Sequence, residues 1–160
     1  MKLFSEYLKE SEQKLKKKGT YSSFQLSKDS KEKLHSFLEK NSIENLVDTD
    51  KYHITVTYSR KAVPKISKIN PELPIKVKAI GWDIFGDGLL VLKLNPSKLQ
   101  SSYDEAIELG ATSDYDEYVP HITVANDYTE EVPKILPKFY ITLDEFEVEE
   151  LDLDYSYDEE

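Results

Sequence analysis

The chain has 160 residues, 39% hydrophobic and 32% charged, with a formal net charge of −10, a composition typical of a globular protein rather than a fibrous or disordered one. Cysteine is absent, which excludes disulfides, thiolate zinc ligands and a cysteine nucleophile. The basic surplus of proteins that bind long nucleic acids is missing, and no apolar run approaches the roughly twenty residues of a membrane span.

The length predicts a single domain over residues 1–160. An apolar stripe predicts an N-terminal helix over residues 1–18, with Gly19 after its end. This segment is charged and lacks an apolar signal core, so we expect a cytoplasmic location. Residues 155–160 form an acidic tail that is expected to fray.

The next elements are a strand over 20–26 and a helix over 28–40. Ser27 or Ser30 is expected to cap this helix, and Asn41 to end it. The later elements follow the same rules of periodicity and turn chemistry. In order, they are strands at 52–58, 75–85 and 89–94 with a hairpin turn at 86–88, a helix from Asn95-Pro96 to Gly110, a strand at 119–125, a short helix at 129–136 and one or two closing strands at 139–153.

One tetrapeptide, His-Ile-Thr-Val, occurs twice, beginning at His53 and at His121. Side chains alternate between the two faces of a strand, so each histidine shares a face with the threonine two residues later. Those threonines are Thr55 and Thr123. Each half of the chain contains a helix and ends near one copy. We therefore expect an α+β fold of two pseudo-symmetric lobes of antiparallel sheet, with flanking helices, around a central cleft.

Two His-x-Thr pairs that face one phosphate have a clear chemical use. A neutral imidazole accepts a proton and an imidazolium donates one, so the pair can serve as general base and general acid in an in-line displacement. The threonine hydroxyls can bind the non-bridging oxygens. This chemistry needs no metal or other cofactor. Zinc held by both histidines and a carboxylate stays open as an alternative, whereas a serine triad lacks its glycine-flanked serine.

The paired motifs resemble those of the 2H phosphoesterases, which act on RNA ends and cyclic phosphodiesters. Longer stretches resemble the anti-CBASS nucleases of phages, which degrade cyclic di- and trinucleotide messengers of bacterial immunity. These stretches are residues 18–21, 53–61, 115–123 and 151–154. The resemblance implies a phosphodiesterase that works in the cytoplasm of an infected bacterium. Its implied ligands are cyclic oligonucleotides, with neither long nucleic acid nor membrane as a partner.

The resemblance also implies roles for individual residues. His53 and His121 are the implied acid–base pair, with Thr55 and Thr123 binding the phosphate. Tyr21 and Trp82 stand where the family holds nucleobases, and aromatic faces stack bases without strong sequence preference. An acidic residue in the C-terminal segment is implied too. Glu149 is preferred over Glu150 because it shares strand parity with Leu151 and Leu153.

Two other functions remain open at this stage. The chain could sequester a cyclic nucleotide without cutting it, as a binding module with stacking aromatics. Alternatively, the same histidines could act on RNA 2′,3′-cyclic ends or 2′–5′ linkages, although the net charge of −10 argues mildly against long RNA.

Overall fold

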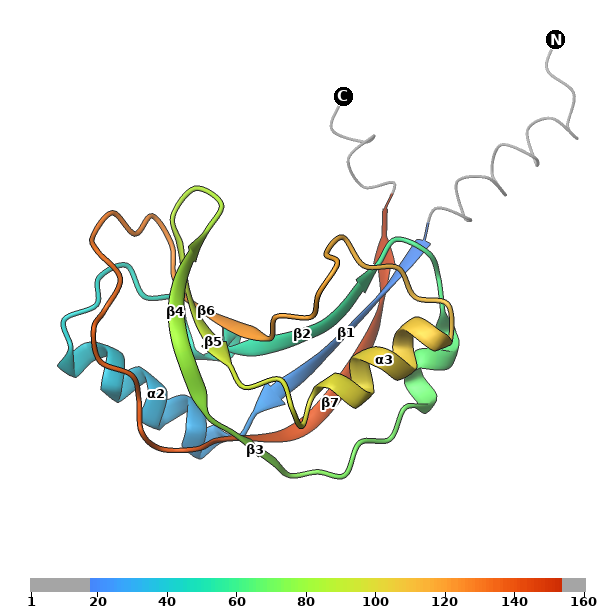
Figure 1. Ribbon diagram of the computed structural model, residues 1–160, viewed down its shortest axis with the longest axis horizontal. Coiled ribbons are helices and arrows are strands. Elements are labelled where there is room, and N and C mark those ends of the chain that lie inside the picture. The colour runs from blue at the N-terminus through green and yellow to red at the C-terminus, as the bar shows by residue number, and fades with distance from the viewer. Residues whose placement is uncertain (1–17, 154–160) are drawn as a thin grey trace, which may run out of the picture.

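The computed structural model of the protein describes residues 18–153. Its strands are β1 (Lys18–Leu26), β2 (His53–Ser59), β3 (Ile75–Val77), β4 (Ala79–Phe85), β5 (Leu89–Leu94), β6 (His121–Ala125) and β7 (Ile141–Asp152). They form a four-stranded sheet in the order β2-β1-β7-β3 and a three-stranded sheet in the order β4-β5-β6 (Figure 1). All pairings are antiparallel. The α+β prediction is confirmed.

The helices flank these sheets, and each follows from a local sequence signal. They are α2 (Lys28–Lys40), α3 (Gln100–Glu108) and the short 3₁₀ segments η1 (Thr49–Lys51) and η2 (Pro64–Lys68). Ser27 caps α2 because its hydroxyl accepts a hydrogen bond from the Ser30 amide, at 3.1 Å. Asn41 ends that helix, as predicted.

The two strands that carry the tetrapeptides are edge strands. β2 is one edge of the larger sheet, β6 is one edge of the smaller sheet, and these two strands contact each other. The segment before β2 extends along β6, where the Val47 amide donates to the Val124 carbonyl at 3.0 Å. The Tyr118 hydroxyl in turn donates to the backbone carbonyl of Thr55 at 2.9 Å. Residues far apart in sequence are thereby fixed side by side.

The apolar half of each tetrapeptide anchors its strand in the main core. Ile54, Ile122 and Val124 are 0% exposed and Val56 is 3% exposed. Burying each such side chain contributes about 1.5–3 kcal/mol. The neighbouring histidines and threonines are only half-buried, as the alternation of strand side chains requires.

The predicted strand over 75–85 is wrong as one element. The chain leaves the four-stranded sheet at Val77 and enters the three-stranded sheet at Ala79. Between these strands, the Lys78 carbonyl accepts a hydrogen bond from the Asn95 amide at 2.9 Å. Both strands are partly buried, so their apolar pattern runs on without a break. Periodicity alone does not mark the change of sheet.

The helix predicted to start at Asn95-Pro96 begins later, at Gln100. The Asn95 side chain accepts from the Ser97 amide at 3.0 Å, which makes a tight turn instead of a helix cap. Gly110 follows the helix end with a positive φ of 111°, as expected of a glycine there. Ala106 of this helix is buried, whereas Ile107 is 37% exposed.

The short helix predicted at 129–136 does not form. Pro133 lacks an amide hydrogen and interrupts a helical ladder. Two carbonyls in this stretch bind side chains instead. The Glu131 carbonyl accepts from the Tyr128 hydroxyl at 2.6 Å, and the Ile135 carbonyl accepts from Trp82 Nε1 at 3.0 Å.

Several predictions concern the chain ends. The helix expected over 1–18 lies outside the described residues except for Lys18, which begins β1 rather than ending a helix. The acidic tail at 155–160 lies outside them as well. Among residues 18–153, no helix is long and apolar enough to cross a membrane.

Candidate active site

The two motif histidines are held by the same backbone device. His53 Nδ1 lies 2.7 Å from the Lys51 carbonyl, and His121 Nδ1 lies 2.9 Å from the Val119 carbonyl. A carbonyl oxygen only accepts hydrogen bonds, so Nδ1 carries the hydrogen in both rings. Nε2 of each neutral ring is then left with its lone pair, and neither Nε2 is bonded to another described residue. Both rings are thereby prepared for proton transfer through the same atom.

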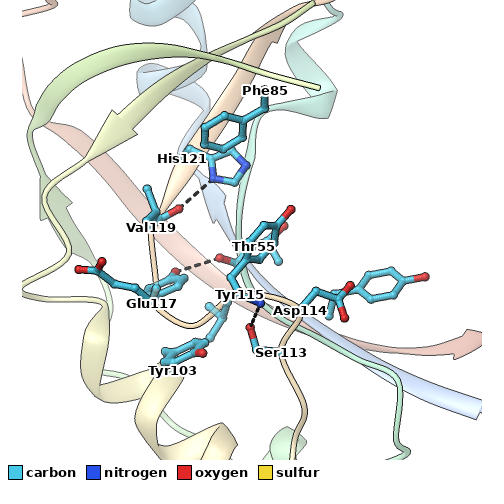
Figure 2. Close-up of a pocket in the computed structure, with 12 residues that line it drawn as sticks. Thr55, Phe85, Tyr103, Ser113, Asp114, Tyr115, Glu117, Val119 and His121 are labelled. Atoms are coloured by element: carbon cyan, nitrogen blue, oxygen red, sulfur yellow. Dashed lines mark hydrogen bonds between the residues drawn. The ribbon is translucent and has the colours of Figure 1, made fainter. Parts of the chain in front are cut away.

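The surroundings of His121 favour its neutral form. Burial lowers the pKa of His121 below the ordinary 6.5, and the positive charge of His53 lowers it further, while the hydrogen bond to the Val119 carbonyl acts in the opposite direction. The Phe85 ring packs edge-on against this imidazole, with 4.8 Å between ring centroids (Figure 2). The charge of His53 thus contributes to the lowered pKa of His121, although less than burial does.

Thr55 bonds to the hydroxyl of Tyr21, a residue for which the family resemblance implied a role in holding a nucleobase. The Tyr21 hydroxyl and Thr55 Oγ1 are 2.7 Å apart and share a hydrogen bond. The Tyr21 ring also contacts His53 edge-on, at a centroid distance of 6.2 Å. Burial raises the pKa of Tyr21, so its hydroxyl stays protonated. The structure thus brings Tyr21, His53 and Thr55 together.

Thr123 lies on the same face of the smaller sheet as His121. His121 is paired with Lys93 of β5 and Thr123 with Val91, whereas Ile122 between them is paired with Leu92. His121 and Thr123 therefore lie on the face of the sheet opposite to Ile122. No hydrogen bond joins the Thr123 hydroxyl to another described residue. This hydroxyl is available to a ligand.

A pocket of ≈ 300 Å³ opens beside Thr55 and His121 (Figure 2). Aromatic side chains make up much of its wall, namely Tyr58, Phe85, Tyr103, Tyr115 and Tyr118. The rings of Tyr103 and Tyr118 stack in parallel, with a centroid distance of 4.7 Å and an interplanar angle of 6°. His53 and Thr123 are not among the residues that line it.

Sequence reasoning missed most of this aromatic wall. The acidic, tyrosine-rich stretch at 113–118 was the available signal, because five of the residues that line the pocket come from it: Ser113, Asp114, Tyr115, Glu117 and Tyr118. Arg60, the residue after β2, connects this stretch to the larger sheet through a bidentate ion pair with Asp114, at 3.0 Å from Nε and 2.8 Å from Nη2. The spacing of residues in the sequence does not reveal this ion pair.

The structure does not bring Trp82 to the pocket. Trp82 is paired with buried Leu92, on the face of the smaller sheet opposite to His121. Its ring packs against the main core and its indole hydrogen bonds to the Ile135 carbonyl. Phe85 occupies the aromatic position near His121 instead. The nucleobase role of Trp82 stays a prediction.

Glu149 and Glu150 lie on opposite faces of β7. Glu149 is paired with Tyr21 across the β1–β7 ladder, and its negative charge contributes to the raised pKa of that tyrosine. Glu150 is paired with buried Thr20 and forms an ion pair with Lys18, at 3.7 Å. Glu149 therefore shares the face that carries Tyr21. Whether it contacts substrate stays a prediction.

The zinc alternative needs a third ligand. In the stretch 18–153, no group of three or more histidine, aspartate or glutamate side chains is arranged to hold a metal ion.

The sequence was compared with protein-family models. Residues 18–158 match the model described as "Anti-CBASS protein Acb1". The chain belongs to this family. An Acb1 protein of Vibrio phage KVP40 is 31% identical over 147 residues, covering 88% of this chain and 93% of the relative. An Acb1 protein of Acinetobacter phage Ac42 is 32% identical over 120 residues, covering 73% and 79%.

Solved structures share the fold of this Acb1 family member. E. coli LigT complexed with 3′-AMP aligns with a TM-score of 0.60 at 16% identity, over 82% of this chain and 86% of LigT. The MHV ns2 PDE domain aligns with a TM-score of 0.55 at 17% identity, over 83% and 99%. These likenesses confirm the 2H phosphoesterase fold class that the sequence predicted.

Proposed function

We propose that this Acb1 family member is a metal-independent phosphodiesterase that cleaves 3′–5′ bonds of cyclic di- and trinucleotides. The observation that carries the proposal is the duplicated histidine clamp, in which each Nδ1 is bonded to the carbonyl two residues earlier. It leaves two equivalent Nε2 atoms on adjoining strands. The family match supports cyclic oligonucleotides as the class of ligand, and the proposed location is the cytoplasm of an infected bacterium.

In the proposed reaction, His121 is the general base and His53 the general acid. Neutral His121 removes the proton from a ribose 2′-hydroxyl, whose oxygen attacks the adjacent phosphorus. The bond from phosphorus to the 5′-oxygen breaks, and His53 as imidazolium donates its proton to that leaving oxygen. The products are an opened chain with a 2′,3′-cyclic phosphate at one end, which water can then hydrolyse. The lowered pKa of His121 favours its role as the base.

The threonines have the complementary task of binding charge. Hydroxyls of Thr55 and Thr123 donate to the non-bridging oxygens, where negative charge grows in the transition state. Thr55 can donate to the phosphate while accepting from Tyr21, whose hydroxyl lies 2.7 Å away. With Tyr21 as the donor, the Thr55 hydrogen remains available to the phosphate.

The aromatic pocket supplies a place for one nucleobase of the ring. Its wall of tyrosines and Phe85 can stack a base, worth about 1–3 kcal/mol for each base. Glu117 also lines the pocket and can accept a hydrogen bond from a base that carries an exocyclic amine. A net charge of −10 disfavours long RNA and leaves a small ligand held by local contacts as the better match.

The direct test incubates the full chain with 3′,3′-cyclic GMP–AMP in EDTA and follows the products by chromatography. We expect linear dinucleotide to appear and the ring to disappear. Intact ring that is released when the protein is heated would replace this proposal with sequestration. Faster turnover of an RNA oligomer with a 2′,3′-cyclic end, measured side by side, would move the substrate class to RNA.

A further inference from the structure

A second pocket lies at the N-terminal end of α3, separate from the aromatic pocket. It has a volume of ≈ 550 Å³ and lies between the residues before and within β3 and the first turn of α3. Lys76, Lys98, Ser101 and Ser102 line it, together with Glu72. None of these residues lines the pocket beside His121. Its chemistry therefore has to be explained separately.

Two backbone donors at this helix end have no acceptor among residues 18–153. The amides of Leu99 and Gln100 bond to the Pro96 carbonyl, and that of Tyr103 to the Leu99 carbonyl. The intervening amides, of Ser101 and Ser102, have no bond to a described carbonyl or side chain. Nor does a side chain cap α3, whose first turn contains no acidic residue. Such exposed amides, at the positive end of the helix dipole, attract anions.

Ser102 provides a second, independent observation at this pocket. Its side chain is 4% exposed, yet its hydroxyl has no hydrogen-bond partner among residues 18–153. In that same range, every side-chain oxygen or nitrogen that is sealed from solvent does have a partner. The Ser102 hydroxyl therefore keeps a small accessible surface, and Ser102 is one of the residues that line the pocket. Any further hydrogen-bond partner of this hydroxyl has to reach it through that small surface.

Two lysines beside these amides carry the positive charge that attracts an anion. Lys76 and Lys98 are both exposed, and neither forms an ion pair with another described residue. Glu72 is the one acidic side chain in the lining, so the cations outnumber it. We propose that this pocket binds a phosphate dianion, through the amides of Ser101 and Ser102, the Ser102 hydroxyl and the two lysines. The proposal is independent of the phosphodiesterase activity.

The test titrates ¹⁵N-labelled full chain with inorganic phosphate at constant ionic strength, with sodium chloride as the reference salt. We expect saturable shifts of the Ser101 and Ser102 amide signals. Lys98→Ala and Ser102→Ala should each weaken the apparent affinity about two- to fivefold, as expected for exposed charge pairs and single hydrogen bonds. Lys65→Ala removes an exposed lysine of η2 outside this pocket and should change nothing.

Signals of the His121 and Thr123 amides report phosphate in the catalytic cleft separately, so failure of one site does not obscure the other. A second titration with adenosine 5′-monophosphate identifies the source. Tighter binding than phosphate assigns the site to a nucleotide, and equal binding to the free ion. Shifts that rise linearly with phosphate, or that Lys98→Ala and Lys65→Ala weaken equally, would overturn the proposal.

Discussion

The two motif strands are alike in what holds each histidine and different in what surrounds it. On both strands, Nδ1 donates to the carbonyl two residues earlier. His53 belongs to the larger sheet and contacts a tyrosine that also bonds to its threonine. His121 belongs to the smaller sheet and packs edge-on against Phe85, with a pKa lowered by burial. A repeated tetrapeptide thus yields two half-sites with separate electrostatics.

The residue after each tetrapeptide shows why the halves diverge. Thr57 is 2% exposed and shares a buried hydrogen bond with Ser22, at 2.7 Å, where the register of β1 shifts. Ala125 stands at the equivalent place and is fully buried without a polar group to satisfy. The hydroxyl of Thr57 serves the packing of the larger sheet. The difference between Thr57 and Ala125 therefore concerns packing. The different neighbours of His53 and His121, in contrast, affect proton transfer.

Removing either imidazole should have the largest effect. His53→Ala and His121→Ala are each expected to lower kcat on a cyclic dinucleotide by about 10²–10⁴-fold, the usual contribution of general acid–base catalysis. Because both protons move in one displacement, the double variant should lose little more than the worse single one. Product formation under initial-rate conditions measures all three. A double variant whose loss equals the product of the two single losses would separate the histidines into independent roles.

His35→Ala is the matched control for these variants. His35 is the third histidine of the chain, and both of its ring nitrogens have partners: Tyr52 at 3.3 Å and Glu39 at 3.3 Å. It lies on α2, away from the residues that line the aromatic pocket. Activity should therefore survive this change. A loss as large as that of His121→Ala would show that histidine removal acts through folding.

The half-sites also show how far the sequence leads. Alternation along the tetrapeptides puts Ile54 and Ile122 on the face opposite to the histidines, where both are buried, and Ser27 is the one of the two predicted caps that caps its helix. These signals are local, because strand period and cap chemistry depend on neighbouring residues. The aromatic partner of His121 is Phe85, which reaches it only through the pairing of β4, β5 and β6. No local pattern shows which face of a sheet an aromatic residue will share with a distant histidine.

The Tyr21 hydroxyl bonds to Thr55, whereas Thr123 has no such partner among the described residues, and this difference allows a finer test. Tyr21→Phe keeps the ring against His53 and removes the hydrogen bond to Thr55. We expect kcat to fall about three- to tenfold, since one such bond contributes about 0.5–1.5 kcal/mol. Tyr128→Phe is the control, because that hydroxyl bonds to the Glu131 carbonyl, outside the site. Equal effects of the two substitutions would mean that Tyr21 supports the fold rather than the reaction.

The smallest expected effect is a displacement of the pH profile. Burial keeps His121 neutral below its ordinary pKa of 6.5, so the acidic limb of kcat/KM should lie on the acid side of that value. Phe85→Leu shortens the ring that covers the imidazole and admits water. The pKa of His121 should then rise, and the acidic limb should move to higher pH. Tyr58→Leu alters the same pocket without removing a ring contact to His121, and should leave the limb in place. If Phe85→Leu lowers the rate equally at every pH, the Phe85 ring acts by binding a nucleobase. The contact between Phe85 and His121 would then not be what lowers the pKa of His121.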